Sequence, residues 1–275
     1  MVYLILDLDN TVWNKQALDS RTYELVSEAV FGRKISMLKH PVTDEEDHEF
    51  PRHSNAQIWR YKLEQIMAAG ETLLFHGEPM TSLPSLPILN SLVTALGEYG
   101  FRHLSDQERS YEEVQLYLSP EALADIGQHA TGIGVATSGS LPLQDGLLQH
   151  FGYYAPTREY GIDQALCSFA EDGNSKETLI RSCLDKYFTE FSKYPSQVVY
   201  VGDSVNDMSA VQIRRGCKTR EGISYKAVGV LTGVDSEQQL TRAGADIVLP
   251  SLSDMVSNGK LKSMLQELSR TEIVR

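Results

Sequence analysis

Two carboxylates follow directly after an apolar run at the amino terminus. Residues 2–6 are all apolar, and Asp7 and Asp9 come next, ahead of Asn10 and Thr11. Such a run fits a strand buried on both faces of a parallel sheet, and open α/β sheets place their ligands at the carboxyl ends of their strands. Paired carboxylates there could attack an electrophile, exchange protons or hold a cation. The alternative is that they merely turn the chain and cap a helix.

Further polar residues lie where two other apolar runs end. Thr137 and Ser138 close one run, Asp203 follows another, and Asp207 comes four residues later. Lys176 stands at a predicted helix start. Each has an ordinary alternative role, as a strand-end hydroxyl, a surface lysine or a helix cap. Because the carboxyl ends of parallel strands share one edge, however, all of them could meet the amino-terminal carboxylates in one crevice.

These side chains complement one another chemically. Asp7, Asp9 and Asp203 offer the oxygen ligands that Mg²⁺ prefers, and water and substrate would complete its octahedron. The hydroxyl of Thr137, nearby backbone amides and the ammonium group of Lys176 suit the oxygens of a phosphoryl group. We therefore predict a Mg²⁺ site beside a phosphate site.

The elements that position these residues alternate between helix and strand from residue 119 onward. Strands are predicted at residues 133–137, 165–169, 197–201, 227–231 and 246–249, with helices between them and a last helix at 252–268. Alternating units of this kind imply a parallel sheet with helices on both faces. The predicted fold class is α/β, with a Rossmann-like core.

Residues 14–118 have a different pattern, which predicts helices and loops without a strand. Helices are expected at about 20–31, 54–70, 87–100 and 105–118. The first strand is thus separated from its sheet by a long segment. We interpret residues 14–118 as an inserted all-helical cap domain, and residues 1–13 and 119–275 as the core. An insert after the two aspartates would cover the site like a lid.

Composition and charge exclude several classes of protein. Of the 275 residues, 41% are hydrophobic and 23% are charged, which is ordinary for a soluble globular protein. The net charge of −12 argues against nucleic acid and anionic membrane as partners. No apolar run approaches the roughly 20 residues of a membrane span. The three cysteines cannot all pair and show no metal-ligand spacing. We expect a cytoplasmic monomer or homodimer.

In their order and spacing, these motifs resemble the haloacid dehalogenase-like hydrolase superfamily. Its four ordered motifs look like residues 7–11, Thr137, Lys176 and residues 202–207. Residues 229–233 and 243–246 are similar to the late core of its subfamily I, in the phosphoglycolate-phosphatase-like branch. A helical insert directly after the first motif is similar to that branch's C1-type cap.

The resemblance implies a role for each residue. Asp7 would be the nucleophile that forms an aspartyl-phosphate, and Asp9 the general acid and base, with its backbone carbonyl on Mg²⁺. Asp203 would complete the metal ligands that the protein supplies. Asp207 would not bind the metal directly but would orient Lys176 or a metal-bound water. The phosphoryl oxygens would be clamped by Thr137, Ser138 and Lys176.

The same resemblance narrows the function but leaves alternatives open. Family members that cleave carbon–halogen or phosphonate bonds lack an aspartate at the position of Asp9, whereas phosphatases and phosphomutases carry it. We expect a phosphatase acting on a small phosphorylated metabolite. A phosphomutase is the first alternative, and a non-hydrolytic phosphoacceptor or binding protein the next. A signalling receiver would need only about half this length. The branch's short Gly-rich cap signature is missing, which argues against phosphoglycolate as substrate.

Overall fold

The computed structural model describes residues 1–35, 55–75, 77–85, 87–89, 91, 111, 113–156, 159–217 and 222–271. The chain forms two compact units. The first combines Met1–Asn14 with Gln115–Arg275, and the second is Lys15–Val114. The predicted role of the second unit as a cap stays a prediction.

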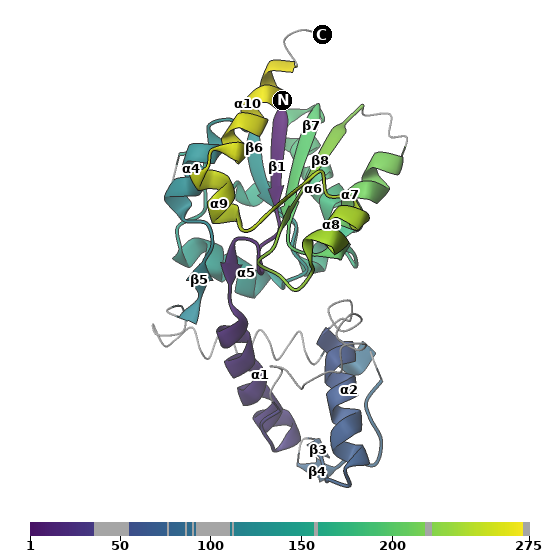
Figure 1. Cartoon of the computed structure of the whole chain (residues 1–275). Helices are drawn as coiled ribbons and strands as arrows, with labels where there is room; N and C mark the ends of the chain where they lie inside the picture. The colour runs from purple at the N-terminus through teal and green to yellow at the C-terminus, as the bar shows by residue number, and fades with distance from the viewer. Residues whose placement is uncertain are drawn as a thin grey trace. The chain divides into compact units, whose positions relative to one another are not determined.

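The first unit is built on a parallel five-stranded sheet of order β6-β1-β7-β8-β9 (Figure 1). The strands are β1 Val2–Leu6, β6 Gly132–Val135, β7 Gln197–Gly202, β8 Ser224–Val230 and β9 Ile247–Leu249. The chain adds β6 on one side of β1 and then returns to add β7 on the other side. Strand order therefore reverses at β1, and a ligand crevice is expected outside its carboxyl end.

Helices cover both faces of this sheet, which confirms the predicted Rossmann-like α/β core. In Figure 1, α10 passes in front of the sheet and α6 lies behind it. Tyr3, Ile5 and Tyr200 pack with buried residues of α6, α7 and α8 in one apolar cluster. The helices are α4 Pro120–Gly127, α5 Leu141–His150, α6 Lys176–Phe191, α7 Val205–Gly216, α8 Glu237–Ala243, α9 Leu252–Ser257 and α10 Lys260–Thr271.

The second unit has two described helices, α1 Gln16–Phe31 and α2 Asn55–Ala68. They share a small apolar core that includes Phe31 and Leu63. Gly32 ends α1 in the left-handed conformation (φ 68°), directly after the helix predicted at about 20–31.

The prediction that this segment is entirely helical was wrong. The short strands β3 Leu74–Phe75 and β4 Glu78–Pro79 form an antiparallel pair within it. Two-residue strands are too short to show the period-two pattern by which strands are recognised in a sequence. Most of the helices predicted at 87–100 and 105–118 lies outside the described residues.

Another short pair replaces the end of the helix predicted at 105–118. There, β5 Gln115–Leu116 pairs antiparallel with β2 Trp13–Asn14. The two chain segments that connect the sheet to the insert therefore run side by side.

Two other predicted elements of the core also differ. Residues 165–169 are not a strand: Gln164–Leu166 form a 3-10 turn, and only Ser168 makes an isolated bridge, to Ala136. The Asp163 carboxylate accepts from the backbone N–H of Ala165 at 3.0 Å, which favours the turn over a strand. The helix predicted at 252–268 is divided into α9 and α10 at Gly259, where φ is 68°.

Among the residues that the structure describes, no helix is both long enough and apolar enough to cross a membrane.

Replacing Ile5 in β1 should destabilise the protein strongly, because its side chain is fully buried and the Ala variant leaves a cavity. For Ile5→Ala we expect a loss of roughly 2–5 kcal/mol in the free energy of unfolding, measured by urea denaturation. The matched control is Ile213→Ala on α7, where the side chain is 56% exposed. A control that loses as much stability as Ile5→Ala would contradict this account of the core.

Candidate active site

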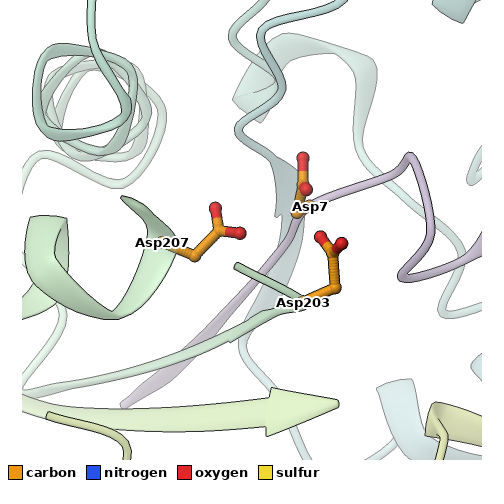
Figure 2. A group of neighbouring side chains, drawn as sticks. All are labelled: Asp7, Asp203 and Asp207. Carbon is orange, nitrogen blue, oxygen red and sulfur yellow. The ribbon is translucent and has the colours of Figure 1, made fainter. Parts of the chain in front are cut away.

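Three aspartates from two neighbouring strand ends converge at the switch point of the sheet. Asp7 follows β1, Asp203 follows β7, and Asp207 lies in the first turn of α7. One carboxylate oxygen from each lies within 4.8 Å of the others, and all three residues are buried. Figure 2 shows their carboxylates gathered around a common space. Like charges this close either raise the pKa of a carboxyl group or are balanced by a positive partner.

Lys176 supplies one positive charge to this cluster. It is the first residue of α6, whose start is fixed by the Ser175 hydroxyl accepting from the backbone N–H of Thr178. The Lys176 ammonium lies 2.5 Å from Asp7 Oδ1 and 3.0 Å from Asp207 Oδ1. It also donates to the carbonyl oxygen of Ala136, at 3.2 Å. Lys176 therefore connects the ends of β1, β6 and α7.

Both oxygens of Asp207 are already occupied by donors from the protein. Oδ1 accepts from the Tyr200 hydroxyl at 2.7 Å, in addition to Lys176. Oδ2 accepts from the backbone N–H of Ser204 at 3.1 Å and from its hydroxyl at 2.5 Å. Asp207 thus has little remaining capacity to bind a cation, and it is well placed to orient Lys176.

Asp203 has a more open arrangement. Its Oδ1 accepts from the hydroxyl of Thr11 over 3.4 Å, a long hydrogen bond. Its Oδ2 faces Gly233 so closely that a Cβ there would lie 2.0 Å away. The loop that carries Gly233 is held by the Thr232 hydroxyl, which donates to the carbonyl of Asn10. The β8–α8 loop therefore forms a wall of the site, which was not predicted from the sequence.

Burial and mutual repulsion shift the ionisation of the cluster. Burial raises the pKa of Asp7 to about 7, although Lys176 opposes the shift. Burial and the neighbouring carboxylates of Asp207 and Asp7 raise the pKa of Asp203 well above its usual value. For Lys176, burial lowers the pKa, but the two adjacent carboxylates outweigh it and raise the pKa. One ammonium group is insufficient for this much buried negative charge, and a divalent cation would relieve it.

The donor set fits Mg²⁺ on these grounds. Asp7 and Asp203 present buried carboxylates, and their contacts within the described part of the chain leave lone pairs of these oxygens available to a cation. Hard carboxylate oxygens with room for water are what Mg²⁺ requires.

The remaining predicted residues lie beside this cluster. The Asp9 carboxylate accepts from the indole N–H of Trp13 at 3.1 Å and from the amide of Gln144. Thr137 is buried, and its hydroxyl accepts from the backbone N–H of Gly139 at 3.1 Å. Ser138 is exposed next to it. Ion pairs thus join Asp7, Lys176 and Asp207 directly, whereas Asp9, Thr137 and Ser138 lie at the adjoining strand ends.

Sequence reasoning missed Tyr200 and Gln144. Tyr200 lies within an apolar strand, so a hydrogen bond from its hydroxyl to a carboxylate was not expected. Gln144 carried a usable signal, because it precedes the buried Leu147 and Leu148 by three and four residues. A polar residue on the apolar face of a helix needs a buried partner.

Comparison with known proteins identifies the family. A family model described as haloacid dehalogenase-like hydrolase matches residues 2–212. The chain therefore belongs to the haloacid dehalogenase-like hydrolases, and it is an enzyme of that class. No curated protein matches it significantly.

Solved structures share the fold at low sequence identity. A hydrolase from Pseudomonas syringae is 17% identical, with a TM-score of 0.55 over 94% of this chain and 97% of its own. CbbY from Rhodobacter sphaeroides, solved in complex with phosphate, is 16% identical, with a TM-score of 0.55 over 92% and 95%. A predicted phosphatase from Clostridium acetobutylicum is 18% identical, with a TM-score of 0.52 over 93% and 96%. These likenesses confirm the fold.

Neutralising Asp203 should stabilise the protein when no metal is bound. A raised pKa means that the folded protein disfavours the ionised carboxylate of Asp203. At neutral pH this carboxyl group therefore lowers the free energy of unfolding, and an uncharged Asn would remove that loss. For Asp203→Asn in EDTA we expect the free energy of unfolding to rise by about 1 kcal/mol or more, the scale of one pKa unit. Stabilisation by added Mg²⁺ should disappear in the same variant. Denaturant titration with and without Mg²⁺ measures both effects.

The matched control is Asp125→Asn, because Asp125 is an exposed carboxylate that pairs with Lys262 on the surface. It should change stability by less than about 0.5 kcal/mol and keep the response to Mg²⁺. A loss of stability in Asp203→Asn under EDTA would contradict the repulsion described here.

Proposed function

We propose that this chain is a Mg²⁺-dependent phosphatase that hydrolyses a small phosphomonoester through an aspartyl-phosphate on Asp7. The observation that carries the proposal is the contact of Asp7 with Lys176 at the switch point of the sheet, beside the open carboxylate of Asp203. A nucleophile, a fixed positive charge and metal ligands are what transfer of a phosphoryl group requires.

In this proposal Asp7 attacks phosphorus through its carboxylate, and the bond to the leaving oxygen breaks. Lys176 neutralises charge on the phosphoryl oxygens and holds Asp7 in position. The metal would be held by the carboxylates of Asp7 and Asp203 and by the backbone carbonyl of Asp9. When bound, Mg²⁺ supplies further positive charge to the transferred group. Asp207 acts through Lys176, which it contacts at 3.0 Å.

Asp9 and the hydroxyl residues complete the proposed mechanism. The Asp9 carboxyl group protonates the leaving oxygen and then removes a proton from the water that hydrolyses the aspartyl-phosphate. Thr137 and Ser138 would bind phosphoryl oxygens at the end of β6.

The proposed substrate is a small phosphorylated metabolite in the cytoplasm. The three cysteines support a reducing compartment, because Cys167, Cys183 and Cys217 are all free. Nothing in the strongly acidic composition favours nucleic acid or an anionic membrane as a partner.

Replacing the nucleophile should abolish turnover. For Asp7→Asn we expect phosphate release from a panel of phosphomonoesters to fall by about a thousandfold or more, because an amide does not form the acyl-phosphate. The control is Asp185→Asn, an exposed carboxylate on α6, which should keep wild-type activity. An active Asp7→Asn variant would contradict the mechanism. Isomerisation of sugar phosphates without net phosphate release would favour a phosphomutase instead.

Removing divalent metal should also stop the reaction, and reversibly. We expect phosphate release by the wild type to disappear in EDTA and to return with excess Mg²⁺. Without the metal, the negative charges of Asp7 and of the phosphoryl group would repel each other. Release that continues in EDTA, from protein shown to be metal-free by elemental analysis, would contradict the metal dependence.

A further inference from the structure

Gln144 contacts the carboxylate of Asp9 from a fully buried position in the first turns of α5. Its Nε2 lies 3.1 Å from Asp9 Oδ1 and 3.0 Å from Asp9 Oδ2. The indole N–H of Trp13 donates to Oδ1 as well, at 3.1 Å. Two donors that approach from different elements fix both the position and the rotation of this carboxylate.

The backbone is shaped to admit the glutamine. A Cβ at Gly139 would lie 2.1 Å from Nε2 of Gln144 and 2.7 Å from its Cδ. The side-chain amide therefore packs directly on the main chain of Gly139, where only glycine leaves room. The loop that carries Gly139 also donates the N–H that the Thr137 hydroxyl accepts. One turn of chain thus supports both a predicted phosphate ligand and the residue that holds Asp9.

Stability alone does not explain a glutamine here. Its Oε1 is buried and finds no hydrogen-bond partner among the residues that the structure describes. An unpartnered buried carbonyl oxygen costs free energy, and an apolar side chain of similar volume would avoid that cost. The glutamine, unlike an apolar residue, donates a hydrogen bond to Asp9.

We propose that Gln144 is the positioning residue for Asp9, holding its carboxyl group in line with the leaving oxygen of the substrate. The inference rests on the proposed function, in which Asp9 is the general acid and base. Proton transfer depends steeply on alignment, so a carboxyl group free to rotate would transfer its proton less often. Gln144 itself touches neither substrate nor metal in this role.

The kinetic test uses two esters that differ in their need for an acid. An alkyl phosphate needs its leaving oxygen protonated, whereas p-nitrophenyl phosphate releases a stable anion. For Gln144→Leu and Gln144→Glu, we expect kcat/KM for the alkyl ester to fall about tenfold to a hundredfold, and for the aryl ester only a few fold. Leu removes the donor, and Glu keeps the size of the side chain but exchanges the amide for a carboxyl group that competes with Asp9 for a proton. The control is Gln149→Leu, an exposed glutamine on the same helix.

A second measurement needs no turnover. The chain has two tryptophans, so ¹⁵N labelling gives two indole signals, and Trp59→Phe assigns them. Because Trp13 shares Asp9 Oδ1 with Gln144, its indole N–H signal should shift in Gln144→Leu and stay in place in Gln149→Leu.

The two measurements separate the inference from the proposed function. Equal loss on both esters, or an unchanged Trp13 signal, would overturn the role of Gln144. If the wild type hydrolyses neither ester, the proposed function fails. The Trp13 signal then still decides whether Gln144 fixes the Asp9 carboxylate.

Discussion

The folded core has to keep several buried carboxylates close together. Three aspartates lie with their oxygens within 4.8 Å at the end of β1 and β7, and a single ammonium group, that of Lys176, joins two of them. Burial makes each negative charge more costly and each favourable contact stronger. The hydroxyls of Tyr200 and Ser204 and the helix start at Ser175 all serve to hold this cluster in one arrangement.

The topology of the sheet explains why the cluster lies where it does. Because β1 has a parallel neighbour on each side, side chains that follow it are surrounded by the ends of β6 and β7. Strand ends on a packed sheet are rigid, so the repelling groups cannot simply move apart. The three carboxylates therefore stay close together beside one ammonium group, an arrangement in which a divalent cation would reduce the repulsion.

Features that depend on neighbouring residues in the sequence were predictable, whereas contacts between distant residues were not. Unbroken apolar runs predicted β1, β7 and β8. Parallel topology then placed the ends of these strands together. The contact between Gln144 and Asp9 spans 135 positions, so the local pattern shows that Gln144 needs a buried partner but does not identify Asp9 as that partner. The two-residue strands were missed because pairing, rather than periodicity, defines them.

The pairing of β2 with β5 has an evolutionary consequence. Since Asn14 and Gln115 are neighbours across this pair, the insert leaves and re-enters the sheet domain at one point. A segment of another length or fold could be exchanged there while the strand register and the charged cluster stay unchanged. The insert and the charged cluster can therefore diverge on separate stretches of the gene, so that one can change in length or fold without rebuilding the other.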